Sequence, residues 1–188
     1  MPENIIRGCH FDHNNGAGFY AQSRGSPSGI ADAFILDSIF NANGASGFYQ
    51  IDLERSAGFH IMNNQLYGSP TGDLRAKGAG SLKILGNDFD GSANINKGGI
   101  VESVVITAGG WGTVIITGNT FHIQATSLSG SSNWVMLSLT ENAHSGMAVT
   151  GNSFYSSSIP VKSVVVGGRF PTTITESGNS FSPLSPTP

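Results

Sequence analysis

Charged residues are scarce in this chain of 188 residues: Asp, Glu, Lys and Arg make up 11% of it, and the formal net charge is −3 at pH 7. No basic cluster is present, so nucleic acids and anionic membrane surfaces are poor candidates as partners. The single cysteine, Cys9, excludes an intrachain disulfide. No apolar run is long enough to cross a bilayer, and no signal peptide opens the chain, so export would need another route.

Motifs for cofactors and metals are also missing. We find no G-x-S-x-G elbow, P-loop or dinucleotide fingerprint, which argues against a cofactor enzyme. The histidines are spread along the chain without metal-ligand spacing, which argues against zinc. Residues 88–96 (DFDGSANIN) begin like a calcium loop but lack its closing Glu, so a surface turn is expected there. The sequence therefore predicts no cofactor and no metal site.

What the chain does contain is an eight-residue pattern that ends in a large apolar residue. The clearest copy is VIITGNTF, and the closing residues of successive copies are 23 to 33 positions apart. A period in this range that varies between copies is typical of a solenoid whose turns tolerate loop insertions. Apolar and polar residues alternate, with β-branched residues before a Gly-Asn corner, which predicts strand, turn, strand. The copies are residues 4–11, 33–40, 59–66, 82–89, 114–121, 147–154 and 174–181.

Two positions of the pattern are nearly constant. The residue five places before the closing one is Ile or Val except at Glu176, which predicts an inward-facing column. The residue two places before it is mostly Asn, which tolerates a left-handed backbone and can bond to the next copy, so an asparagine ladder is expected. The first column is Ile6, Ile35, Ile61, Ile84, Ile116 and Val149; the second is Cys9, Ser38, Asn64, Asn87, Asn119, Asn152 and Asn179.

With its ladder and its Gly-Asn-x-Phe corners, the chain resembles the right-handed parallel β-helices of the pectin-lyase-like superfamily, which includes pectate lyases, polygalacturonases and many phage tailspikes. The resemblance covers nearly the whole chain. It implies an all-β, single-stranded parallel β-helix of about seven coils with three strands per coil, but it does not specify an activity.

The expected domain is residues 1–182, followed by a proline-rich tail, residues 183–188, that cannot continue a strand ladder. The first copy begins near Asn4, which leaves no room for an N-terminal cap. We therefore expect a piece of a longer β-helix, or an end that another chain covers.

A candidate binding strip follows from the residue after each closing one. In four successive copies this residue is Tyr67, Asp90, His122 and Tyr155. Stacked strands lie about 4.8 Å apart, so these four would form a strip roughly 14 Å long, the length of a few sugar rings. Tyrosine faces with Asp and His hydrogen-bonding groups are expected of a carbohydrate groove. The alternative is a face that packs against another copy of the chain, where Tyr is also enriched.

Candidate catalytic residues come from the resemblance, because polysaccharide hydrolases of this fold rely on two or three carboxylates. The candidates on or beside the third strand are Asp52, Glu54 and Asp73, with Glu102 and Glu141 further along. Carboxyl separations of about 5 Å or roughly 6.5–9.5 Å fit retaining or inverting hydrolysis. Lyases of this fold use a Lys or Arg base, and three such residues lie near the first three carboxylates: Arg55, Arg75 and Lys77. All of these charges can equally be solvated surface groups.

Two functional classes remain open. In the first, the chain is a tailspike-like protein, extracellular or in a virion, that binds a polysaccharide as a homotrimer, with cleavage by hydrolysis or elimination left open. In the second, it is a non-catalytic structural or adhesive spike segment whose exposed columns serve assembly.

Overall fold

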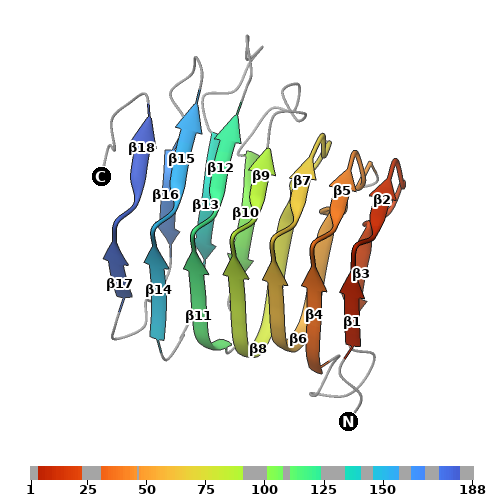
Figure 1. Ribbon diagram of the computed structural model, residues 1–188, viewed down its shortest axis with the longest axis horizontal. Helices are drawn as coiled ribbons and strands as arrows, with labels where there is room; N and C mark the ends of the chain where they lie inside the picture. Colours follow the sequence, from red (N-terminus) through yellow and green to blue (C-terminus); the bar gives the residue numbers. More distant parts are fainter. Residues whose placement is uncertain are drawn as a thin grey trace.

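The computed structural model describes residues 4–22, 31–45, 47–90, 101–107, 111–123, 134–140, 146–156, 162–167 and 174–182. Within these ranges every regular element is a β-strand, and neighbouring strands pair in parallel (Figure 1). The chain is therefore an all-β parallel β-solenoid, which confirms the predicted fold class. Glu141 and the tail at 183–188 lie outside the described residues, and no helix in the described ranges could span a bilayer.

One sheet is built only from the strands that contain the closing apolar residues. Seven such strands stack in sequence order, from the red N-terminal end to the blue C-terminal end of Figure 1. Each is three or four residues long and consists of the closing residue, one residue before it and one or two after it. The strands are β2 (His10–Asp12), β5 (Ile39–Asn41), β7 (Gln65–Tyr67), β9 (Asp88–Asp90), β12 (Thr120–Ile123), β15 (Ser153–Ser156) and β18 (Ser180–Ser182).

The other strands form one eleven-stranded network. Strands before a corner are β1 (Asn4–Arg7), β4 (Ala31–Leu36), β11 (Trp111–Thr117), β14 (Gly146–Thr150) and β17 (Ile174–Ser177). Third strands of the coils are β3 (Phe19–Gln22), β10 (Val101–Thr107), β13 (Trp134–Thr140) and β16 (Lys162–Gly167). Two strands of twelve residues combine both roles, since each is the third strand of one coil and runs on into the first strand of the next: β6 (Ile51–Met62) and β8 (Leu74–Leu85).

The expected number of about seven complete coils is too high. About four turns have buried inward-facing side chains on all three strands among the described residues. The copies at the two ends add strands that are mostly exposed, as in β1 and around Glu176. The enclosed turns are those closed by Phe40, Leu66, Phe89 and Phe121, whose third strands bury Leu53, Ala76, Val104 and Leu137.

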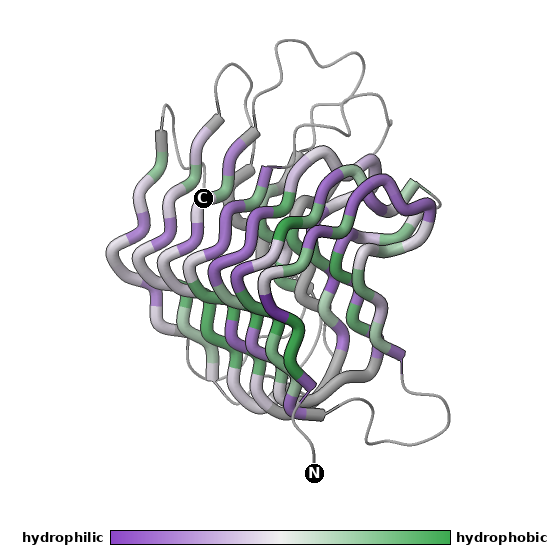
Figure 2. The backbone as a smooth tube through the Cα atoms, turned by 45° about the vertical axis from the view of Figure 1, so that its right-hand side comes forward, coloured by the Kyte–Doolittle hydropathy of each residue, from purple (hydrophilic) through white to green (hydrophobic). Residues whose placement is uncertain are grey.

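The core consists of stacked columns, as the repeat predicts. Register pairs Ile35 with Ile61 and Ile84 with Ile116, and all four side chains are buried. The closing rings stack on one another, with ring centroids 4.8 Å apart for Phe121 and Phe154. Figure 2 shows the result as green apolar lines and purple polar lines that run across successive coils. Burial of these columns is the main force that holds one coil on the next.

The corner before each closing strand combines a left-handed residue with a buried asparagine. The residue before the ladder position has positive φ in every copy, for example +66° at Gly118 and 56° at Asn63. The ladder asparagines themselves do not take this conformation, since none of them has positive φ. Glycine precedes most of them because it adopts a left-handed backbone without steric cost.

The asparagine ladder itself is present. Asn119 Oδ1 accepts hydrogen bonds from the backbone N–H and the side-chain amide of Asn87, at 2.9 and 3.0 Å. Its own Nδ2 donates to the Ile84 carbonyl and to Asn152 Oδ1, both at 2.9 Å. The same pattern repeats from Asn64 to Asn179. The ladder therefore fixes the register of one coil on the next.

Candidate functional site

Strand pairing brings the four residues of the predicted strip into one column. Tyr67 is in register with Asp90, Asp90 with His122, and His122 with Tyr155. The column lies on the outer face of the seven-stranded sheet because Leu66, Phe89, Phe121 and Phe154, one position earlier, point into the core. The alternation of sides along each short strand thus exposes the column as a line across four coils.

The two tyrosines at the ends of the column are the exposed part of it. Tyr67 is 37% exposed and Tyr155 is 42% exposed, and they are among the few large side chains with apolar surface that are open to solvent in the described ranges. Between them lie the more enclosed side chains of Asp90 and His122. The column therefore offers two aromatic surfaces separated by a polar centre.

The polar centre contains a second carboxylate that the sequence reasoning missed. His122 Nε2 lies 3.2 Å from Asp90 Oδ2, and His122 Nδ1 lies 3.3 Å from Asp88 Oδ1. The Asp88 contact is an ion pair that lacks hydrogen-bond alignment, so the contact to Asp90 is the stronger one. Period-two spacing was the available signal, because Asp88 and Asp90 flank the inward Phe89 and must share the outer face.

This arrangement favours the charged imidazole. The hydrogen bond to Asp90 raises the pKa of His122 above its usual value, burial opposes this, and the charges of both aspartates add to the increase. Both ring nitrogens of His122 face carboxylates, one in a hydrogen bond to Asp90 and the other in an ion pair with Asp88, so neither is directed at a ligand. The polar centre consequently presents mainly carboxylate oxygens, which accept hydrogen bonds.

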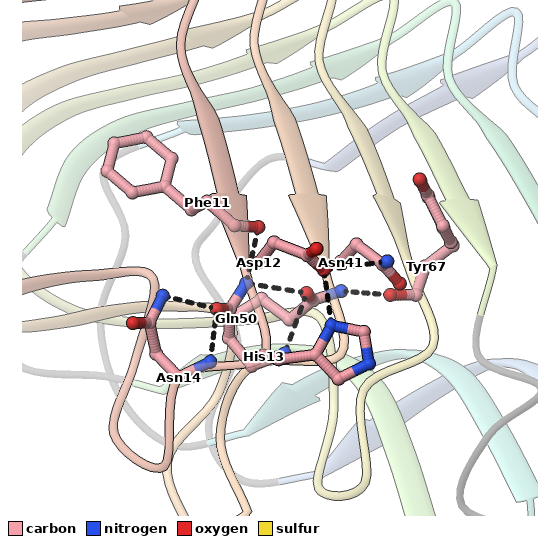
Figure 3. A network of polar contacts seen from close by, with 8 residues as sticks. Phe11, Asp12, His13, Asn14, Asn41, Gln50 and Tyr67 are labelled. Carbon is pink, nitrogen blue, oxygen red and sulfur yellow. Dashed lines mark hydrogen bonds and ion pairs between the residues drawn. The ribbon is translucent and has the colours of Figure 1, made fainter.

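The N-terminal end of the sheet continues the polar face with a hydrogen-bonded network (Figure 3). Asn41 Nδ2 donates to Asp12 Oδ1 at 2.8 Å, and His13 Nδ1 lies 2.6 Å from the same oxygen. Gln50 Nε2 donates to the carbonyl of Tyr67 at 3.1 Å. The backbone of Tyr67 is therefore fixed by the side-chain amide of the buried Gln50, which limits movement of this end of the strip.

The predicted catalytic residue Asp73 belongs to the same buried network. Its side chain is fully buried, and its Oδ1 accepts a hydrogen bond of 3.1 Å from Gln50 Nε2. Gln50 also contacts Asn43, whose amide continues to the Phe11 carbonyl. These contacts give Asp73 a role in holding the loop between coils, at a depth that a polysaccharide does not reach.

Asp52, the second predicted catalytic residue, forms a buried ion pair. Its side chain is 0% exposed, and Arg75 donates to its two oxygens at 2.8 and 2.5 Å. The guanidinium also lies 5.2 Å from the centroid of the Tyr49 ring, and the hydrogen bond to Asp52 raises the pKa of Arg75. Asp52 and Arg75 therefore satisfy each other, which argues against Asp52 as a general acid and against Arg75 as a base.

Of the candidate catalytic carboxylates whose side chains the structure describes, Glu54 is the one that reaches solvent, with its side chain 28% exposed. Its Oε2 accepts hydrogen bonds from Tyr20 Oη and Gln22 Nε2, both at 3.1 Å, and Lys77 Nζ lies 4.0 Å from Oε1. Burial raises the pKa of the Tyr20 hydroxyl, and the Glu54 hydrogen bond adds to the increase.

The structure does not bring the two predicted sets together. Asp52 and Glu54 lie on β6 in the large network, whereas the strip lies on the seven-stranded sheet. No group of three His, Cys, Asp or Glu side chains suited to a metal ion occurs in the described ranges. Of the other candidates, Glu141 and residues 91–96 of the calcium-like segment lie outside those ranges, and the side chains of Glu102 and Arg55 are not described.

The fold and this face define the chain as a parallel β-solenoid with an exposed column of aromatic, acidic and histidine side chains. No protein-family model matches the chain, and comparisons with curated proteins and with solved structures find no match either.

Proposed function

We propose that this β-solenoid binds an extended polysaccharide along the column of Tyr67, Asp90, His122 and Tyr155. The observation that carries the proposal is the pair of exposed tyrosines, 37% and 42% exposed, at the two ends of a polar centre in one straight column. Tyrosine rings stack on the C–H faces of sugars, and carboxylates accept hydrogen bonds from sugar hydroxyls. The resemblance to tailspikes and other pectin-lyase-like proteins supports the same class of ligand.

Three strand spacings separate Tyr67 from Tyr155, which is roughly 14 Å at about 4.8 Å per strand. A polymer that lies along the stack of coils would place successive sugar rings over successive strands. The column is built on short strands fixed by the ladder and the core, so little ordering is needed when the ligand binds.

The test is binding to immobilised oligosaccharides and polysaccharides by Tyr67→Ala, Tyr155→Ala and Tyr20→Ala. Tyr20 is a matched control because it is 41% exposed but lies on β3 in the other sheet. We expect each strip variant to bind roughly tenfold more weakly, the equivalent of about 1.4 kcal/mol. The Tyr20 variant should bind like the unaltered protein. Equal binding by all of them would refute the proposal.

A second candidate is that the same face forms an interface between copies of the chain, as in a trimeric or fibrous spike. Exposed tyrosines on a flat sheet favour this as well, because Tyr is enriched at interfaces. Light scattering separates the two candidates. Loss of an oligomer in Tyr67→Ala or Tyr155→Ala would assign the column to assembly, whereas unchanged mass with weaker glycan binding would assign it to the sugar.

Our proposal is limited to binding. Asp52 and Asp73 are buried and bonded to Arg75 and Gln50, respectively. The only other carboxylate on the strand of Glu54 is Asp52, which is already paired, so Glu54 lacks a free carboxylate partner there. Cleavage by Glu54 is tested directly with a polysaccharide that the protein binds. A fall in viscosity over time that disappears in Glu54→Gln, while binding persists, would show cleavage; constant viscosity is the result expected for binding alone.

A further inference from the structure

The seven-stranded sheet that carries the strip has an unusual charge distribution. Its strands contain three aspartates (Asp12, Asp88, Asp90) and two histidines (His10, His122), but neither Lys nor Arg, in the part of the chain that the structure describes. Arg75 and Lys77, which contact Asp52 and Glu54, are on β8 in the other sheet. No permanent positive charge on these strands is therefore available to hold an anionic ligand.

The centre of the strip is negative in both protonation states of its histidine. Asp88 and Asp90 contribute two negative charges, and His122 contributes at most one positive charge, which leaves a net charge of −1 or −2. A carboxylate or sulfate placed about 4 Å from a net negative charge is repelled by about 1 kcal/mol in water and by more at a partly enclosed site. An ammonium group at the same place is attracted by a similar amount.

Hydrogen-bond chemistry also disfavours anionic ligands at the centre of the strip. The carboxylates of Asp88 and Asp90 accept hydrogen bonds and cannot donate them when ionised. His122 Nε2 is hydrogen-bonded to Asp90 and Nδ1 lies 3.3 Å from Asp88 in an ion pair, so both nitrogens face these carboxylates rather than a ligand. A ligand at the centre must therefore supply donors. Hydroxyl and ammonium groups do so, whereas uronate and sulfate groups supply only acceptors.

We infer that the strip binds glycans that lack anionic groups, and that it prefers amine-bearing sugars over neutral ones. This inference rests on the proposed function, and it names the substrate class of the same column. The tyrosines at the ends provide stacking that does not depend on charge, and the central aspartates provide the selection. Glycosaminoglycan-like and pectin-like anionic polymers are excluded.

The test uses an array of immobilised oligosaccharides in three groups: neutral, amine-bearing, and uronate- or sulfate-bearing. Binding is read at pH 5.5, where the amines are charged, in low and in high salt. We expect signals on amine-bearing and neutral glycans, with the amine signals falling in high salt and the neutral ones changing little. All of these signals should fall in Tyr67→Ala and Tyr155→Ala.

A double variant and a control variant on another face isolate the role of the aspartates. The double variant Asp88→Asn/Asp90→Asn should reduce the ratio of amine-bearing to neutral binding by roughly tenfold, as expected for the loss of about 1.4 kcal/mol of charge attraction. Asp37→Asn is the control for altered net charge, because Asp37 is exposed at a corner and pairs with Arg7 away from this face. It should leave the ratio unchanged.

The outcomes separate the inference from the proposed function. Tyrosine-dependent binding to anionic glycans that equals or exceeds neutral binding would overturn the inference and leave the proposed function intact. An unchanged ratio in the double aspartate variant would also overturn it. If none of the three groups shows binding that depends on the tyrosines, both the inference and the proposed function are refuted.

Discussion

Substitution of Asn119 by Ala tests the central support of this fold. Asn119 is 1% exposed, and its amide makes hydrogen bonds to both neighbouring coils. The substitution removes the acceptor of the Asn87 backbone N–H and a donor to the Ile84 carbonyl. Both backbone groups stay in the protein at a place that water does not reach.

The expected cost follows from these unpaired groups. One buried backbone group without a partner costs about 1–3 kcal/mol, and the second group moves the total toward the upper end, so we expect a loss of about 3 kcal/mol. Stability in a solenoid depends mainly on contacts between neighbouring coils. The damage should therefore be concentrated in the coils on either side of Asn119.

Urea unfolding and hydrogen exchange measure the two parts of this prediction. The unfolding midpoint should fall, and the Asn87 amide should exchange about 100-fold faster, which corresponds to about 2.7 kcal/mol of local protection. Thr120→Ala is the control, since Thr120 is the exposed neighbour of Asn119 and surface changes stay within about 0.5 kcal/mol. An unchanged midpoint together with unchanged protection of Asn87 would show that the ladder bonds do not stabilise the fold.

Three further predictions concern charge and backbone. Arg75→Met should destabilise by about 3 kcal/mol in urea unfolding because it leaves the carboxylate of Asp52 buried and unpaired. Gly118→Ala should cost about 1–2 kcal/mol in the same assay, since Gly118 has φ of +66° although space for a methyl group is open. The pKa of His122 is raised, so its pairing stabilises the fold at pH below about 6.5 and is lost as pH rises through the higher value. Asp90→Asn should lower that pKa in an NMR titration.

Those features of the fold that depend on the repeat could be predicted from the sequence. The closing residue and the ladder position lie two places apart in every copy, so the register of the core and of the outer column next to it follows by counting. This is why Tyr67, Asp90, His122 and Tyr155 were placed together correctly. Asp88, the second partner of His122, lies one position before the closing Phe89, so the same count also places it on the outer face.

The third strand could not be placed in the same way. The distance from a closing residue to the next third strand changes with each loop insertion, so no count from the repeat reaches it. The burial of Asp52 depends on Arg75 from the next coil, and that of Asp73 on contacts such as the one from Gln50. The closeness of Asp52, Glu54 and Asp73 in the sequence therefore indicated a possible catalytic site. In the structure, Asp52 and Asp73 instead make buried contacts that hold the fold together.

The regular outer column beside the repeat, rather than the third strands, is where we expect function on this fold. A column that stays in register through the ladder presents its side chains at a constant spacing of about 4.8 Å, and a polymer with a regular repeat can follow such a column over several coils. The third strands also pair residue by residue, but their distance from the repeat along the sequence varies with the loops, and Asp52 and Glu54 are occupied by partners on adjacent coils. A change such as Asn119→Ala, which weakens the register without removing a side chain of the strip, should therefore weaken glycan binding at Tyr155 on the next coil only to the extent that it shifts the coils.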